Sequence, residues 1–131
     1  MTVVLDASVV VGALVDGGEV GAWAVDVLRD PALTAPHQLP VEVANILRRA
    51  AASGSVSSDV ASLAHADLLD LRVELVAYAP LADRVWELRE NVTAYDAWYV
   101  ALAERLDAPL ATLDQRLVRA TGPRCDFLVP S

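Results

Sequence analysis

Lysine is absent from this chain of 131 residues, and cysteine occurs once, at position 125. Without lysine the chain cannot contain a P-loop, whose Gly-Lys-Ser/Thr motif holds nucleotide phosphates through a lysine. One cysteine excludes an internal disulfide, and the two histidines, His37 and His65, do not complete a zinc ligand set with it. We therefore expect Cys125 to act as a small apolar residue and give neither histidine a catalytic role.

Long hydrophobic runs are also missing. The run at 9–15 ends at Asp16, well short of the roughly 20 apolar residues that a membrane-spanning helix needs. The first residues contain neither the basic segment nor the small-residue cleavage site of an export signal. We expect a cytoplasmic protein with no membrane contact.

Positive charge is scarce. The formal net charge is −8, and all ten basic residues are arginines. Proteins that bind nucleic acid through a broad basic surface neutralise many phosphates, so this composition counts against that mode of binding. If the substrate is nucleic acid, bound divalent metal and arginine side chains must supply the positive charge.

Strand and helix patterns alternate along the chain. Short β-branched or apolar runs predict strands at 2–5, 33–35, 73–76, 109–113 and 127–129. Helical spacing, prolines and capping residues predict helices after Asp6, at 19–29, 38–52, 57–71, 80–90 and 94–106, and a short helix opened by Asp114. This order predicts an α/β fold with a central, mainly parallel sheet flanked by helices, in one domain spanning residues 1–131.

Four acidic residues occupy positions that such a sheet brings together. Asp6 and Asp114 each follow an apolar strand, whereas Glu42 and Asp96 lie in the first turns of two predicted helices. Because the carboxyl ends of parallel strands share one edge of the sheet, the four carboxylates can converge there. Their mutual repulsion predicts a divalent cation, and oxygen ligands suit Mg²⁺ or Mn²⁺. For each acid taken alone, helix capping remains the alternative explanation.

Four segments carry a resemblance to a known family. They are 3–8 (VVLDAS), 42–47 (EVANIL), 95–103 (YDAWYVALA) and 110–114 (LATLD), and together they extend over nearly the whole chain. In this order the segments resemble the PIN-domain nucleases, and in particular the VapC-type toxins of bacterial toxin–antitoxin pairs. All four acids of the pattern are present.

The resemblance implies roles for individual residues. Asp6, Asp96 and Asp114 would bind the metal, Glu42 would contact it directly or through water, and the Ser8 and Thr112 hydroxyls would support these ligands. It also implies endonucleolytic cleavage of RNA, with Mg²⁺ or Mn²⁺ positioning the attacking water, and a cognate antitoxin that inhibits the enzyme. No nucleotide-type cofactor is expected.

Two other classes of function stay open. A PIN-like fold can serve as a catalytically silent binding module, although intact acids at all four positions favour an enzyme. In a receiver or phosphatase-like domain, Asp6 would accept a phosphoryl group. Such sites pair the aspartate with a lysine, which this chain lacks.

Other side chains are assigned by their spacing. Arg116 and Arg119 can face a phosphate beside the site, or simply form a solvated face. Tyr95, Trp98 and Leu102 fall on one helical stripe, which predicts contacts in the core or in a dimer. The many apolar residues on short helices predict a homodimer and an apolar groove for an antitoxin segment.

Overall fold

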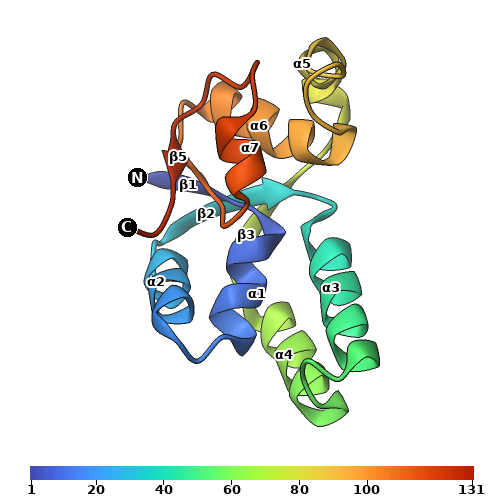
Figure 1. Ribbon diagram of the computed structural model, residues 1–131. Helices are drawn as coiled ribbons and strands as arrows, with labels where there is room; N and C mark the ends of the chain where they lie inside the picture. The colour runs from blue at the N-terminus through green and yellow to red at the C-terminus, as the bar shows by residue number, and fades with distance from the viewer.

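The computed structural model describes residues 1–131 and contains a five-stranded sheet between two groups of helices (Figure 1). The strands are β1 (Thr2–Leu5), β2 (Ala32–Pro36), β3 (Val73–Val76), β4 (Leu110–Ala111) and β5 (Phe127–Leu128). Every neighbouring pair is parallel, in the order β3-β2-β1-β4-β5. The α/β architecture with a parallel central sheet, predicted from the alternating pattern, is confirmed.

Helices cover both faces of this sheet. They are α1 (Ala7–Val15), α2 (Glu19–Leu28), α3 (Leu39–Ser53), α4 (Ser58–Asp70), α5 (Ala82–Glu87), α6 (Ala94–Leu106) and α7 (Gln115–Arg119). In Figure 1 the helices α1 to α4 lie below the sheet, and α5 to α7 lie above it. The central strand is therefore shielded on both faces, and Val3, Val4 and Leu5 are each at most 1% exposed. This double burial explains why β1 reads as a continuous apolar run.

Capping residues end or begin several helices where the sequence predicts. Ser57 and Thr93 accept hydrogen bonds from Val60 and Asp96 backbone N–H groups and so begin α4 and α6. Gly54 ends α3 with φ +82°, a left-handed conformation that glycine adopts without a steric penalty.

The helix expected at 80–90 is wrong in its bounds. The segment instead forms the 3₁₀ turn η1 (Ala79–Leu81) followed by α5, which ends at Glu87. Pro80 has no N–H to donate, and Leu81 N–H bonds to Tyr78 O three residues back, which gives a 3₁₀ turn. After Glu87 the same three-residue spacing returns, with Arg89 N–H bonded to Trp86 O, and the α-helix stops.

The fourth strand is shorter than the predicted 109–113, because β4 ends at Ala111 and sheet hydrogen bonding ends with Thr112 N–H, which bonds to Leu128 O. Leu113 N–H binds Ser8 Oγ instead of a strand carbonyl, and Thr112 directs its hydroxyl toward Asp6. The features that shorten β4 therefore also build the edge of the sheet where the acids lie.

The three residues of the predicted stripe on α6, Tyr95, Trp98 and Leu102, differ in how deeply they are buried. Leu102 is buried and Trp98 is half-buried, but Tyr95 is 68% exposed, so of the two predicted alternatives, core or dimer contact, Tyr95 does not lie in the core. Tyr95 remains available for the predicted dimer contact. No single helix is long and apolar enough to span a membrane, while α1 and α2 pass that test together only as a pair bent by 116°.

Candidate active site

The site lies at the carboxyl edge of the sheet. Asp6 directly follows β1, and Asp114 follows the neighbouring strand β4 after two residues. Leu5 pairs with Ala111 in parallel register, so both strands end at the same level and deliver their aspartates to the same edge. The sheet order thus brings together two residues that are far apart in the sequence.

Asp6 is the innermost acid, with only 7% of the residue exposed. Its Oδ2 accepts hydrogen bonds from Ser8 Oγ at 3.0 Å and from Thr112 Oγ1 at 2.6 Å. The same hydroxyl oxygens accept the backbone N–H groups of Leu113 at 3.0 Å and Asp114 at 3.0 Å. Ser8 and Thr112 therefore fix one carboxylate oxygen of Asp6 and join the end of β1 to the segment after β4, while Oδ1 receives neither hydroxyl.

Helix capping accounts for one of the four acids. Asp114 Oδ1 accepts the N–H groups of Arg116 at 2.9 Å and Leu117 at 3.4 Å, so it caps α7. The Asp6 side chain makes no capping bond to α1, and α6 is capped by Thr93 rather than by the Asp96 carboxylate. The carboxylates of Asp6 and Asp96 are thus placed at this edge without serving as caps.

Glu42 lies in the first turn of α3, where a buried carboxylate oxygen has no partner. Its Oε1 is inaccessible to solvent and makes no hydrogen bond within the protein. The phenol oxygen of Tyr99, on the buried face of α6, is unpaired in the same way. An unpaired buried oxygen is costly, and such groups call for an explanation by function or by a missing ligand.

The pKa values show that the acids act on one another. Burial raises the pKa of Asp6, and the Asp114 charge adds to the rise against the opposing hydroxyl bonds. Burial and then the Asp6 charge raise the pKa of Glu42 from an ordinary 4.5 to about 7, with a smaller contribution from Asp96. Burial and the charges of Asp6 and Asp114 raise the pKa of Asp96. The four acids therefore form one electrostatic cluster that favours protonation or a cation.

The donor chemistry fits a hard divalent cation. Carboxylate oxygens are the ligands that Mg²⁺ and Mn²⁺ prefer, and the unpaired Glu42 Oε1 is an oxygen that a cation or its bound water would satisfy. No group of three or more His, Cys, Asp or Glu side chains is arranged to hold a metal ion in this structure. The charges of the acids nevertheless affect the pKa values of their neighbours in the cluster.

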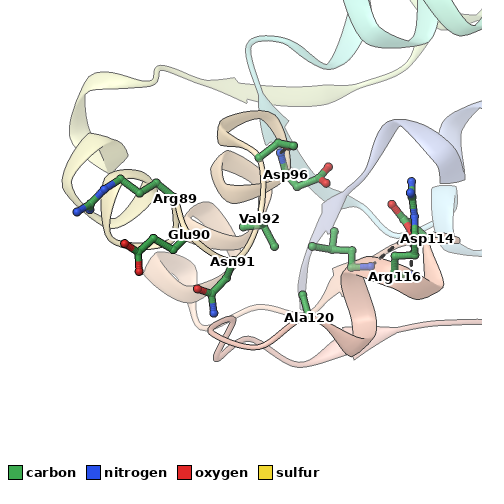
Figure 2. Close-up of a pocket in the computed structure, with 10 residues that line it drawn as sticks. Arg89, Glu90, Asn91, Val92, Asp96, Asp114, Arg116 and Ala120 are labelled. Carbon is green, nitrogen blue, oxygen red and sulfur yellow. Dashed lines mark hydrogen bonds and ion pairs between the residues drawn. The ribbon is translucent and has the colours of Figure 1, made fainter.

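A pocket of about 430 Å³ opens beside two of the acids. It lies between α7 and the 89–93 segment, and its lining includes Asp96, Asp114 and Arg116. Figure 2 shows Asp114 and Arg116 on one side of this pocket and Asp96 across from them. Asp6 and Glu42 are not part of its lining, so the pocket borders the cluster from the α7 side.

The arginines that border the cluster are exposed. The Arg116 side chain is 90% exposed, and its Nε lies 3.8 Å from Asp114 Oδ1, a contact too long and solvated to hold it firmly. Arg119 is also exposed. Both alternatives raised by the sequence, a phosphate contact and a solvated face, agree with this geometry.

Tyr99 is a residue of this region that the sequence pattern does not single out. Within YDAWYVALA it reads as one more large residue of a buried helix face. A signal was nevertheless available, because residues three apart on a helix lie on the same side, and Tyr99 follows Asp96 by three positions. The structure places its hydroxyl near enough to Glu42 and Asp6 that their charges raise the pKa of the phenol beyond the effect of burial.

Comparison with protein families gives a match to the PIN domain over residues 3–123. Among curated relatives, Ribonuclease VapC1 of Mycobacterium tuberculosis (strain H37Rv) is 42% identical over 125 residues, which cover 95% of this chain and 94% of the relative. Ribonuclease VapC9 of the same strain is 35% identical over 127 residues, 97% of each chain.

Solved structures share the fold at low sequence identity. The crystal structure of VapC20 of Mycobacterium tuberculosis, described as a sarcin-ricin loop cleaving toxin, matches with a TM-score of 0.68 at 17% identity and covers 89% of this chain and 93% of that one. VapBC2 from Rickettsia felis, bound to a promoter DNA fragment, matches with a TM-score of 0.69 at 14% identity and covers 98% of each chain.

Proposed function

This chain belongs to the PIN-domain family, and from that premise we propose that it is a metal-dependent endoribonuclease acting as the toxin of a VapBC-type toxin–antitoxin pair. Relatives that cover nearly the whole chain are named ribonucleases, which supports RNA phosphodiester hydrolysis as the reaction. In this proposal residues 1–131 form one PIN-like domain that works in the cytoplasm.

The observation that carries the proposal is the acidic cluster at the carboxyl edge of the sheet. Asp6, Glu42, Asp96 and Asp114 come from four different elements. Burial, then the Asp6 charge and a smaller effect of Asp96, raise the pKa of Glu42 to about 7. Such repulsion destabilises the folded protein unless a ligand offsets it. A functional site is the explanation that accounts for all four positions together.

In this proposal Asp6, Asp96 and Asp114 bind the cation, and Glu42 contacts it directly or through a water. Mg²⁺ or Mn²⁺, when bound, would orient a water for attack on phosphorus and stabilise charge on the phosphodiester. Ser8 and Thr112 hold the Asp6 carboxylate through their hydroxyl hydrogen bonds. Arg116, exposed at the rim of the pocket, supplies positive charge for a substrate phosphate.

Protein partners form part of the proposal. A solved structural neighbour is a VapBC assembly, which supports a cognate antitoxin for this chain. Large apolar side chains on the surface offer area for such a partner and for a homodimer; they include Val41, Leu63, Leu69, Trp86 and Tyr95, each at least 65% exposed. Light scattering at micromolar concentration tests the dimer, and a monodisperse monomer would contradict it.

The direct test is cleavage of a labelled RNA panel by the purified protein. We expect cleavage with added Mg²⁺ or Mn²⁺ and none in EDTA, because carboxylates cannot stabilise phosphate charge without a cation. Asp6→Asn should abolish the activity, and this loss excludes a contaminating nuclease as its source. Full activity in EDTA would contradict the metal mechanism.

A catalytically silent binding module is the second candidate. The pocket beside the cluster favours it, because its lining includes Asp96 and Asp114 but neither Asp6 nor Glu42. Under this alternative the protein binds RNA or its antitoxin with unchanged affinity in the Asp6→Asn variant and cleaves nothing with either metal. The same RNA panel therefore separates the two functions.

A further inference from the structure

The protein contains three buried side-chain polar atoms without a hydrogen-bond partner, and two of them belong to the region of the acidic cluster. They are Glu42 Oε1, in the first turn of α3, and Tyr99 Oη, on the buried face of α6. One is an acceptor when ionised and the other carries a proton to donate. The Tyr99 hydroxyl can therefore donate a hydrogen bond that the Glu42 carboxylate can accept.

The first turns of α3 and α6 adjoin, because Gln38 Nε2 donates to Tyr95 O at 2.8 Å. Glu42 and Tyr99 each follow these residues by four positions, about one helical turn. The Tyr99 hydroxyl lowers the pKa of Glu42 against the larger effects of burial and the Asp6 charge. In return, burial and then the Glu42 charge raise the pKa of Tyr99. The contact falls short of ideal hydrogen-bond geometry in this structure, but each group is near enough to perturb the other.

Packing in the core does not explain why residue 99 carries a hydroxyl group. Tyr99 is 0% exposed among the alanine, valine and leucine side chains of the α6 core, where phenylalanine would pack as well. A phenol buried without a partner costs free energy that phenylalanine does not. Packing explains the ring but not its oxygen.

We propose that Tyr99 is a positioning residue, whose hydroxyl donates a hydrogen bond to the Glu42 carboxylate and holds it toward Asp6 and Asp96. This inference rests on the proposed function, since it assigns Glu42 to a cation site. Tyr99 touches neither the cation nor the RNA. It acts by fixing the orientation of Glu42, as partners behind metal ligands commonly do.

The test is Tyr99→Phe, which removes only the hydroxyl. Mn²⁺ binding to the RNA-free protein, measured by titration calorimetry, should weaken by about 10- to 100-fold, the range typical for loss of a partner behind a ligand. The KM for RNA should stay unchanged while kcat falls. Tyr78→Phe is the matched control, because Tyr78 is 41% exposed and packs edge-on against Trp98. Equal Mn²⁺ affinity in Tyr99→Phe and the wild type would overturn the proposal.

A double-mutant cycle asks whether Tyr99 acts through Glu42. Glu42→Ala removes the acceptor, so adding Tyr99→Phe to that variant should weaken Mn²⁺ binding no further. An undiminished effect of Tyr99→Phe in the Glu42→Ala background would overturn the assignment. Far-UV circular dichroism melts of each variant verify that all four proteins are folded.

A metal-free readout separates this inference from the proposed function. In the protein without cation, the carboxyl ¹³C resonance of Glu42 should shift in Tyr99→Phe and stay in place in Tyr78→Phe. If the wild type neither cleaves RNA nor binds Mn²⁺, the proposed function fails, while the resonance still reports the Tyr99–Glu42 contact. An unchanged resonance in Tyr99→Phe would refute the contact itself.

Discussion

Thr112 Oγ1 lies 2.6 Å from Asp6 Oδ2 and donates a buried hydrogen bond that joins residues 106 positions apart in the chain. The same oxygen accepts the backbone N–H of Asp114 at 3.0 Å. One threonine therefore orients two of the four acids at once, the first through its side chain and the second through its backbone.

We predict that Thr112→Val lowers the free energy of unfolding by about 1–3 kcal/mol, the usual cost when one partner of a buried hydrogen bond is removed. Valine has nearly the same shape, so packing is kept, but the Asp6 carboxylate and the Asp114 N–H each lose a partner. Cleavage and Mn²⁺ affinity should fall together. Urea unfolding and titration calorimetry measure the two effects.

Thr34→Val provides the matched control for that substitution. Thr34 is also buried, at 5% exposure in β2, and its side chain makes no hydrogen bond to an acid of the cluster. The control should retain Mn²⁺ affinity. If both variants weaken Mn²⁺ binding equally, the link from Thr112 to Asp6 is not what positions the site.

We predict that Asp96→Asn stabilises the metal-free protein and raises its melting temperature by about 2–4 °C, the shift that about 1 kcal/mol of relieved repulsion produces in a domain of this size or larger. The pKa of Asp96 is raised by burial and then by the charges of Asp6 and Asp114, so removing its charge removes that repulsion. The rise in melting temperature that Mn²⁺ gives the wild type should largely disappear.

Asp59→Asn is the control for position 96, because Asp59 also lies in the first turn of a helix, α4, but is exposed and remote from the cluster. This variant should keep the wild-type response to Mn²⁺. An Asp96→Asn protein that melts lower without metal and responds normally to Mn²⁺ would show that Asp96 serves only the helix terminus.

The raised pKa of Glu42 predicts how stability depends on pH. Its folded-state pKa of about 7 lies above the ordinary 4.5, so between these values the folded protein holds a proton that the unfolded chain has lost. Folding is then favoured at low pH, and the stability of the metal-free protein should fall as pH rises from about 4.5 to about 7. Melting temperatures in EDTA at intervals across this range measure the effect.

Glu42→Gln removes that titration while keeping the shape of the side chain. The difference in melting temperature between this variant and the wild type should widen in favour of the variant as pH increases, because Asp6 and Asp96 remain in both proteins. A difference that is constant with pH would mean that Glu42 titrates at its ordinary value in the folded state.

Outside the site, Glu104 on α6 connects α5 to the segment before β5. It accepts bonds from Arg84 Nε at 2.7 Å and Nη2 at 3.1 Å, and from the Arg124 backbone N–H at 2.8 Å. We predict that Glu104→Gln lowers the free energy of unfolding by about 1–3 kcal/mol, since the partly buried Arg84 loses its nearer charged partner and keeps only Glu87 at 3.7 Å. Chemical denaturation measures the loss.

An exposed ion pair in the same protein serves as a comparison for the effect of burial on the free energy of unfolding. Arg29 and Asp26 lie 3.0 Å apart with side chains 76% and 69% exposed. Asp26→Asn should change the free energy of unfolding by less than about 1 kcal/mol, because solvent screens the pair. Equal losses at Asp26 and Glu104 would mean that the bidentate contact of Glu104 contributes nothing beyond a surface pair.

The parallel sheet was predictable because its strands are short runs of apolar and β-branched residues that can be recognised in the sequence. A strand buried on both faces must be apolar throughout, and residues 3–5 are. The caps Thr93 and Gly54 also follow from local conformational preferences of their residue types. The end of α5 was not predictable in this way, because it depends on a switch to three-residue hydrogen-bond spacing after Glu87 that no single residue dictates.

The candidate acids were predictable from position, since Asp6 and Asp114 end neighbouring strands in any parallel arrangement of this order. Their individual environments were not. The sequence treats the four as equivalent, whereas the structure buries Asp6, lets Asp114 cap α7 and leaves Glu42 Oε1 unpaired. These differences arise from contacts between distant segments, such as Thr112 with Asp6, which spacing along the chain does not encode.

The central position of β1 also determines when the acids can meet during protein synthesis. Its neighbour β4 begins at Leu110, so the edge that carries Asp6 stays unpaired on that side until the ribosome has released more than a hundred further residues. Asp96 and Asp114 leave the ribosome late as well. A nascent chain therefore carries Asp6 and Glu42 before Asp96 and Asp114 have emerged. The four carboxylates can come together only after the chain has left the ribosome as far as Asp114.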